Sequence, residues 1–274
     1  MKTLEEAFLS KYPNRGVILS YFEQANDCPA LWENLTKIRL ICFVNYLVTK
    51  FSKNSARQYA AKFKALLNEY SEENIIPCKD FNKILSIKKE VSTNVFLTSD
   101  ELIKLEKVGV CSDTEELVKF QFLIGCYTGA RHSDYCRFTE TNISNGVLSY
   151  VSQKTKIQAI IPLKPFVATR VKGVSAGRTI SDKQFNEVIR RLCKRAGIRS
   201  KVKLFRASEE ESGEKWEFVS SHTARRSFAS NLYLLGADIY SISRMMGHSN
   251  VTQTETYIAV QLKKLPDAVM EYFK

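Results

Sequence analysis

The chain has 274 residues, of which 44% are hydrophobic and 26% are charged. This balance is typical of a globular protein and excludes wholesale disorder, and the length suits one large domain or two ordinary ones. Lys and Arg number 41 against 29 Asp and Glu, which gives a net charge of +12 at pH 7. Such a surplus favours a polyanionic partner, nucleic acid first and an anionic membrane surface second.

The sequence lacks the signals of export or of a membrane span. Its most apolar window, residues 40–48, contains Asn45 and is far shorter than the roughly 20 apolar residues that a span requires. Glu5 and Glu6 stand where a signal peptide would have a basic start. The 7 cysteines form no Cys-x-x-Cys pair, and several lie in apolar helical patterns. We therefore expect reduced, buried thiols in a cytoplasmic protein, with no zinc site.

Helical periodicity dominates the first third of the chain. Apolar residues recur at i, i+3 and i+4 over residues 38–46 and again over 59–70, which predicts two amphipathic helices. Asn54 or Ser55 is expected to cap the second helix. The periodicity ends over residues 77–97, where a proline and a lysine cluster precede Ser-Thr-Asn, so this stretch is the best candidate for a linker.

Helix signals resume after the linker. Thr98 and Glu101 form a capping box, and Asp113 with Glu116 opens a second helix that should stop at Gly129. The clearest β signal follows, since the apolar runs 147–151 and 157–161 flank a polar turn at 153–156 and predict a hairpin that Pro162 ends.

The last hundred residues predict mostly helices. Ser181 should cap a helix with one apolar face, closed by Gly197. Residues 200–220 are ambiguous, and a second hairpin with strands at 202–205 and 216–219 would enclose an acidic loop. Three short helices should finish the chain, with Gly236 and Gly247 as stops and Asp238 and Ser249 as starts.

Several basic, imidazole and phenol side chains after the predicted linker could together cleave a phosphodiester. Its transition state places negative charge on non-bridging oxygens, which paired guanidinium donors match at any working pH. A nucleophile must attack phosphorus, and an acid must protonate the departing sugar oxygen. The candidates are Arg131, Lys154, His222, Arg225, His248 and Tyr257.

Taken singly, each candidate also has an ordinary interpretation. A histidine or tyrosine often packs in a core, a lysine in a turn is usually solvated, and Lys156 competes with Lys154 for any role of the turn. His222 and Arg225, however, should share a face on the first turn of a helix, whose N–H groups favour anions. Breaks at Gly247 and Ser249 would let His248 approach Tyr257.

The order and spacing of these residues resemble the tyrosine recombinase, or phage integrase, superfamily. The family's motifs are similar to Thr-Gly-Ala-Arg-His-Ser-Asp (128–134), His-Thr-Ala-Arg-Arg-Ser-Phe-Ala (222–229) and the segment from Met246 to Tyr257. Lys154 matches the family's hairpin lysine. The resemblance spans about residues 98–260. The run Ser-His-Thr-Ala-Arg-Arg-Ser-Phe within it looks most like integrases of Bacteroidetes mobile elements.

The resemblance implies a mainly α fold with two domains. A SAM-like, four-helix core-binding domain would occupy residues 1–93, and an α+β catalytic domain with a small antiparallel sheet would occupy residues 94–274. These domains would form a C-shaped clamp on double-stranded DNA. Four protomers would assemble as a homotetramer on two DNA sites, from a monomer or weak oligomer when free. The resemblance also implies no metal or nucleotide cofactor, no membrane partner, and a cytoplasmic, nucleoid-associated location.

The resemblance also assigns roles at the phosphate. Tyr257 would attack DNA, forming a 3′-phosphotyrosyl bond and leaving a free 5′-hydroxyl. Arg131 and Arg225 would clamp the scissile phosphate, and Lys154 would be the general acid for the 5′ oxygen. The expected reaction is site-specific recombination: integration, excision, inversion or resolution of a mobile element. The alternatives are strand relaxation like that of a type IB topoisomerase, and a catalytically idle DNA-binding relative.

The remaining family roles fall on the histidines. His222 would assist proton transfer, and His248 would hydrogen-bond a non-bridging oxygen. Asp134 stands where the family usually has Glu, a conservative departure. About 90 residues before the catalytic part leave no room for an arm-binding domain, which favours a compact recombinase acting on simple sites. The amphipathic segment 258–274 would pack in cis or dock into a neighbouring protomer.

The charge surplus is concentrated in one stretch. Residues 154–206 hold 15 basic side chains against 2 acidic ones. We predict that this stretch lines a DNA channel, with phosphate contacts that make binding steeply salt-dependent. A solvated basic helix face is the alternative. The predicted DNA-binding residues are Lys156, Arg190, Arg191, Lys194, Arg195 and Arg226.

Overall fold

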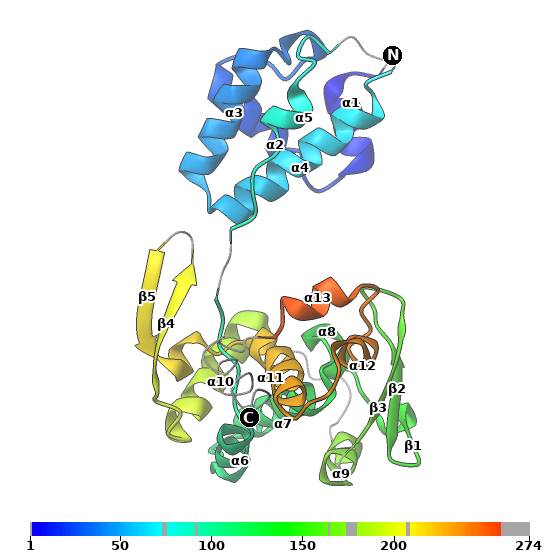
Figure 1. The fold of residues 1–274 in the computed structure, drawn as a ribbon, viewed down its shortest axis with the longest axis vertical. Helices are drawn as coiled ribbons and strands as arrows, with labels where there is room; N and C mark the ends of the chain where they lie inside the picture. The colour runs from blue at the N-terminus through cyan, green and yellow to red at the C-terminus, as the bar shows by residue number, and fades with distance from the viewer. Residues whose placement is uncertain are drawn as a thin grey trace, which may run out of the picture. The chain divides into compact units, whose positions relative to one another are not determined.

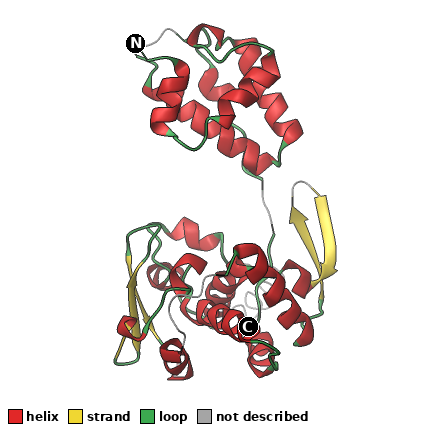
Figure 2. Ribbon diagram, turned by 180° about the vertical axis from the view of Figure 1, so that it is seen from behind, coloured by secondary structure: helices red, strands yellow, loops and turns green. Residues whose placement is uncertain are grey.

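The chain divides into two compact units, which are described separately. One consists of residues 1–92 with 205–209, and the other of residues 93–204 and 210–274. Helices predominate in both (Figures 1 and 2). This computed structural model describes residues 2–72, 76–90, 93–163, 165–173, 180–206 and 209–258. None of the helices within those ranges is long and apolar enough to cross a membrane.

The first unit is a bundle of helices. Its elements are α1 (Leu4–Lys11), α2 (Val17–Asn26), the 3-10 helix η1 (Trp32–Asn34), α3 (Lys37–Lys50), α4 (Lys53–Glu69) and α5 (Phe81–Ile84). The two helices predicted by periodicity correspond to α3 and α4. Aromatic rings fill the core, where Phe22 stacks on Phe63 with centroids 5.9 Å apart and Phe43 packs against both. Burial of these large rings, together with the leucines packed around them, supplies the hydrophobic stabilisation of the bundle.

The cap of α4 differs from the prediction. Ser52, and neither Asn54 nor Ser55, is the N-cap, because its side chain accepts the Ser55 backbone N–H. Asn54 is already helical, and its side-chain amide bonds the backbone of Glu90 through both its oxygen and its nitrogen. The amide therefore fastens the end of the unit to the start of α4.

The predicted linker is too long. Cys78, Phe81 and Leu85 are buried in the core of the first unit, whereas Val95 and Leu97 are buried in the second core. The change from one core to the other therefore takes place between Leu85 and Val95. Lysines on the exposed positions between these apolar residues hid their helical spacing.

The second unit is organised around one buried helix. Its helices are α6 (Ser99–Lys107), α7 (Asp113–Thr128), α8 (His132–Tyr135), η2 (Glu140–Asn142), α9 (Pro165–Gly173), α10 (Asp182–Arg195), η3 (Lys215–Phe218), α11 (Ser221–Leu234), α12 (Ile239–Met245) and α13 (Val251–Glu255). Helix α7 packs against both α10 and α11 (Figure 1). It ends at Gly129 as predicted, with a φ of 65° that favours glycine. The predicted capping box of Thr98 and Glu101 is also present.

The predicted first hairpin is confirmed within a three-stranded antiparallel sheet. The strands β1 (Ile143–Ser144), β2 (Val147–Val151) and β3 (Gln158–Pro162) lie in that order. Leu148 and Tyr150 on β2 and Ala159 and Ile161 on β3 point into the core, which is the period-2 alternation of a half-buried sheet. The sequence did not predict β1, whose two residues are too few to show a pattern.

The second hairpin exists, but its second strand lies elsewhere than predicted. Strand β4 (Lys201–Arg206) pairs with β5 (Glu209–Glu214), which is the segment expected as an acidic loop. Residues 216–218 belong to η3. Lys203 and Glu210 form a cross-strand ion pair of 2.8 Å. Acidic side chains that stay exposed along β5 give no alternation to detect.

Three further expectations need correction. Helix α11 has 14 residues and is not short. Asp238 caps α12 as predicted, but Asn250, and not Ser249, caps α13. Cys42 and Cys111 are exposed, although Cys78, Cys126 and Cys193 are buried as free thiols. The amphipathic segment beyond Ile258 lies outside the described residues.

Candidate active site

Arg131 and Asp134 both bind the start of the β2–β3 turn. It lies at the N-cap of α8, and its Nη1 donates to the Ser152 hydroxyl at 2.9 Å. Ser152 donates in turn to Asp134 Oδ2 at 3.1 Å, and Asp134 Oδ1 accepts the Gln153 backbone N–H at 3.1 Å. A buried aspartate thus holds the turn that carries Lys154 against the segment that carries Arg131.

Arg225 joins three separate parts of the chain. It is almost fully buried on α11, and its guanidinium donates to the carbonyls of Gly129 and Met246, the latter at 2.7 Å. It also reaches His248 Nε2 at 2.5 Å. Burial, then repulsion from Arg131, lowers the pKa of Arg225 to about 10. The side chain therefore stays charged at neutral pH.

His248 is a neutral, buried imidazole. A guanidinium has no acceptor, so Nε2 accepts from Arg225 and the ring proton lies on Nδ1, which donates to Thr254 Oγ1 at 2.9 Å. Burial, followed by the positive charges of Arg225 and Arg131, lowers the pKa of His248 to about 3. In this arrangement the N–H points to Thr254, so a bond to phosphate requires the proton to move to Nε2 and Arg225 to turn away.

Tyr257 lies against both of these groups. Its backbone N–H donates to the Thr254 carbonyl at 2.9 Å, just beyond α13. The half-buried ring has its centroid 5.4 Å from that of the His248 ring and 5.2 Å from Arg225 Cζ. The phenol, the imidazole and the guanidinium thus form one cluster.

His222 lies at the rim of the site, on the first turn of α11. Its side chain is exposed, yet partial desolvation by its surroundings, followed by the positive charge of Arg226, lowers the pKa of His222. His222 therefore stays neutral to a lower pH than a free histidine, as a proton acceptor requires.

Lys154 and Lys156 are both exposed in the β2–β3 turn. Between them, Thr155 Oγ1 donates to the Gly247 carbonyl at 3.2 Å, which places the turn beside the residue that precedes His248. Lys156 has a positive φ of 57°. The turn that carries both lysines therefore lies beside the residue before His248, and its geometry selects neither lysine over the other.

The basic residues of α10 make contacts within the protein. Arg190 Nε donates to the Val219 carbonyl at 3.0 Å, Arg195 forms an ion pair of 2.6 Å with Glu115, and the Lys194 ammonium lies 4.7 Å from the centre of the Trp216 ring. Arg191 is exposed and Arg226 on α11 is half-buried. The role of these residues and of Lys156 in DNA binding stays a prediction. Among the predicted DNA-binding residues of α10, the exposed Arg191 is the one best placed to reach a phosphate.

Sequence reasoning missed three polar participants. Ser152 is fully buried at the end of β2, between Arg131 and Asp134. The other two are Asp182 and His132, which lie in hydrogen-bond contact at 2.9 Å beside the site. Burial lowers the pKa of His132, so the ring is neutral at neutral pH and donates from Nδ1 to the carboxylate. A serine on the apolar face of a strand was the available signal for Ser152. The pairing of His132 with Asp182 joins residues fifty positions apart and has no local signature.

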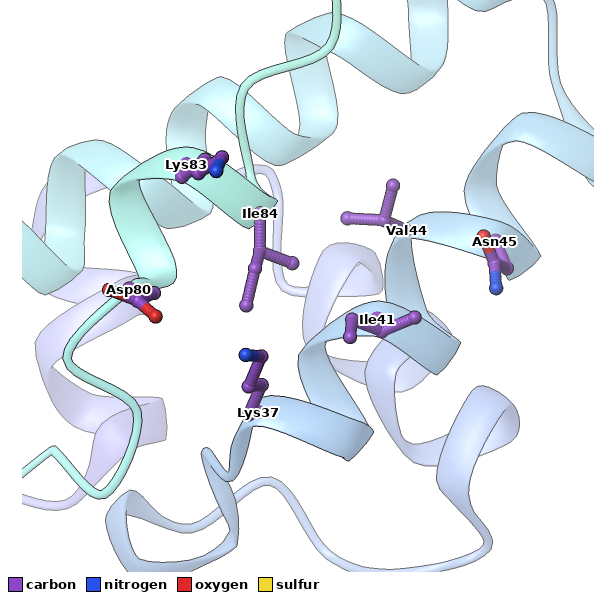
Figure 3. Close-up of a pocket in the computed structure, with 7 residues that line it drawn as sticks. All are labelled: Lys37, Ile41, Val44, Asn45, Asp80, Lys83 and Ile84. Atoms are coloured by element: carbon purple, nitrogen blue, oxygen red, sulfur yellow. The ribbon is translucent and has the colours of Figure 1, made fainter.

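An open groove also lies in the first unit (Figure 3). Its volume is about 370 Å³. The lining comes from α3 and from the segment around α5: Lys37, Ile41, Val44, Asn45, Asp80, Lys83 and Ile84. It contains none of the candidate catalytic residues.

Residues 96–264 match the phage integrase family. The chain is 24% identical over 245 residues to tyrosine recombinase XerC of Thermodesulfovibrio yellowstonii, and this match covers 78% of this chain and 74% of that protein. It is 22% identical to the XerC of Syntrophus aciditrophicus, and that match covers 89% of this chain and 84% of that protein.

Solved structures share the fold. A lambda integrase fragment, a dimer bound to a core site, superposes with a TM-score of 0.67 at 17% identity, covering 94% of this chain and 95% of that one. The Tn1549 transposon integrase in complex with transposon right end DNA gives a TM-score of 0.67 at 18% identity, covering 99% of both chains. The expected mainly α fold with small antiparallel sheets is thereby confirmed, and the chain belongs to the phage integrase family of tyrosine recombinases.

Proposed function

We propose that the protein is a site-specific recombinase that cleaves and rejoins double-stranded DNA through a tyrosine–phosphate intermediate. The observation that carries this proposal is the cluster around Arg225, in which one buried guanidinium contacts His248 and lies against the Tyr257 ring. Burial of a charged arginine costs free energy, so packing alone gives little reason to place one beside a tyrosine. A buried guanidinium at this cluster would instead serve to bind the negatively charged phosphodiester.

The reaction we propose conserves the energy of the phosphodiester. Tyr257 Oη attacks phosphorus, and the bond from phosphorus to the 5′ oxygen breaks. The phenol proton passes to His222, while Lys154 or Lys156 in the β2–β3 turn protonates the 5′ oxygen. Arg131 and Arg225 balance the charge on the non-bridging oxygens. Attack by a 5′-hydroxyl on the phosphotyrosine reverses these steps and rejoins the strand.

Assembly and biological setting are further parts of the proposal. We propose that residues 1–93 form the core-binding domain and residues 94–274 the catalytic domain. Four protomers would act on two DNA sites, in the cytoplasm and on the nucleoid. An origin in Bacteroidetes mobile elements is supported by the run 221–228. The relatives quoted above are named recombinases and integrases, which favours recombination over strand relaxation.

Covalent trapping tests this proposal. A duplex carrying the element's junction and a nick close to the cleavage point releases a short fragment after attack, so the protein–DNA adduct accumulates. We expect an adduct on a denaturing gel with the wild type and none with Tyr257→Phe, which should still bind DNA. An adduct that persists in Tyr257→Phe would disprove the assignment of the nucleophile.

A further inference from the structure

Three polar side chains on α10 form a row that faces the catalytic segments. Asp182, Asn186 and Arg190 are spaced four residues apart and so share one face of the helix. Asn186 Oδ1 accepts the backbone N–H of Ser221 at 2.8 Å, at the first turn of α11. Arg190 Nε donates to the Val219 carbonyl at 3.0 Å, just before that helix. Two members of the row therefore fix the backbone that leads into His222.

The third member of the row holds the residue after Arg131. Asp182 Oδ1 lies 2.9 Å from His132 Nδ1. The His132 ring packs against Phe185 and Tyr135, with centroids 4.3 Å and 5.2 Å away. The carboxylate and the two rings leave His132 a single orientation.

The contact between Asp182 and His132 contributes little to stability, even when the ring is protonated. The side chain of Asp182 is 82% exposed. Exposed ion pairs typically add less than about 1 kcal/mol to the free energy of unfolding. Asp182 also lies in the first turn of α10, where an exposed acid interacts favourably with the helix dipole by about 1 kcal/mol or less. Both structural contributions are small, and residues 154–206 hold only one other acid, Glu187.

We propose that Asp182 and Asn186 are positioning residues for His222, Asn186 through the backbone of α11 and Asp182 through its charge and through His132. The inference rests on the proposed function. The charged and titratable groups that act on His222 are Arg225 and Arg226 on its own helix, His132 on α8 and Asp182 on α10. Asp182 is the acid among them, and it opposes the positive charges that face the imidazole.

The two acids of the basic stretch provide a matched test of Asp182. Asp182→Asn and Glu187→Gln each remove one negative charge from α10, so both should change the general attraction for DNA equally. Glu187 is exposed and lies about 140° around the helix from Asp182. The rate of adduct formation on the nicked duplex is measured in single turnover as a function of pH.

In Asp182→Asn we expect the acidic limb of this profile to move to lower pH. Asp182 favours protonated His222, so without it His222 remains a neutral acceptor at a lower pH. The pH profile of Asp182→Glu should stay close to that of the wild type, and the profile of Glu187→Gln should coincide with that of the wild type. Coincident profiles for Asp182→Asn and Glu187→Gln would overturn the role of Asp182. Absence of an adduct in the wild type would instead refute the proposed function.

Asn186 has its own pair of variants. Asn186→Asp keeps the acceptor for Ser221, whereas Asn186→Leu removes it. We expect cleavage by Asn186→Leu to fall about tenfold or more, since misplacement of a catalytic group by 1 Å costs up to about a hundredfold. The DNA affinity of Asn186→Leu should be unchanged. Asn186→Asp adds a negative charge, so it is compared at saturating DNA and on the pH-independent plateau, where it should cleave nearly as fast as the wild type. Equal cleavage rates for the two variants would overturn the role of Asn186.

Discussion

Arg225 Nη2 lies 2.5 Å from His248 Nε2, and this contact fixes the protonation of the ring as well as its position. The guanidinium can only donate, so Nε2 accepts, and the Nδ1–H is directed to Thr254. Hydrogen bonds to the Gly129 and Met246 carbonyls use one further N–H of Nη1 and one of Nη2, whereas the buried Nε–H has no partner among the described residues.

Arg225→Lys should abolish cleavage although it keeps the charge. An ammonium on a flexible stem cannot reach the two carbonyls and His248 in the planar geometry of a guanidinium. We expect adduct formation to fall by about a hundredfold or more, as for loss of a transition-state donor. Single-turnover trapping measures this, and DNA binding should persist. Cleavage within a few-fold of the wild type would show that geometry at this position is unimportant.

The two lysines of the β2–β3 turn can be separated by the leaving group. Sulfur at the 5′ bridging position departs without a proton, so it rescues the loss of a general acid. We expect Lys154→Ala to cleave poorly on ordinary DNA and well on the phosphorothiolate substrate. For Lys156→Ala, the cleavage rate relative to the wild type should be the same on ordinary DNA and on the phosphorothiolate substrate. Selective rescue of Lys156→Ala would move the acid role to that residue.

Folding stability should depend on pH through His248. Its pKa is about 3 in the folded protein, below the ordinary value of 6.5, so the unfolded chain binds the proton more readily. The contribution is complete above pH 6.5 and is lost as the pH falls from there toward 3. In His248→Gln, the fall in free energy of unfolding over this window should be shallower. Chemical denaturation at several pH values gives the free energy of unfolding against pH for the wild type and for His248→Gln. Equal slopes for the two proteins would show that His248 does not carry this pH dependence.

Salt dependence of DNA binding should distinguish two arginines of α10. Arg191 is exposed, whereas the charge of Arg195 is paired with Glu115. Arg191→Gln should reduce the slope of log affinity against log salt by about one, as expected for one lost phosphate contact. Arg195→Gln should change the slope less. Equal slopes for the wild type and Arg191→Gln would show that Arg191 makes no phosphate contact.

Gly129→Ala should destabilise the fold and impair the site together. The φ of 65° disfavours a side chain, and a Cβ there would collide with the Phe228 ring. We expect the free energy of unfolding to fall by about 1 kcal/mol or more. Because Arg225 donates to the Gly129 carbonyl, adduct formation should fall as well. Thermal unfolding and trapping measure the two effects, and an unchanged melting temperature would contradict the predicted collision.

Local signals predicted much of the fold. Thr98 and Glu101, Gly129, Ser181 and Asp238 mark helix ends through side-chain or backbone chemistry that acts within four residues, and the structure has helices beginning or ending there. Strand β5 has exposed acids along its length, and its pairing with β4 depends on a distant register that no short window contains.

The candidate site was predictable in its residue types but not in its connections. Motif order identified Arg225 and His248, and the structure brings them together. Direct contact between Arg225 and His248, and the intervention of Ser152 between Arg131 and Asp134, depend on how α11 and the sheet pack. The same packing gives Arg190 and Arg195 partners inside the protein, where charge counting alone suggested DNA.

The repulsion between Arg131 and Arg225 has a consequence for the order of events at the site. The charge of Arg131 adds to burial in lowering the pKa of Arg225, so the fold holds the two guanidinium groups together at an energetic cost. Gly129, Met246 and Ser152 offset this cost by accepting their hydrogen bonds. An anion that binds both groups lowers this cost. The pair is therefore least favourable before DNA arrives, and the phosphate that enters the site should stabilise the folded protein as it binds.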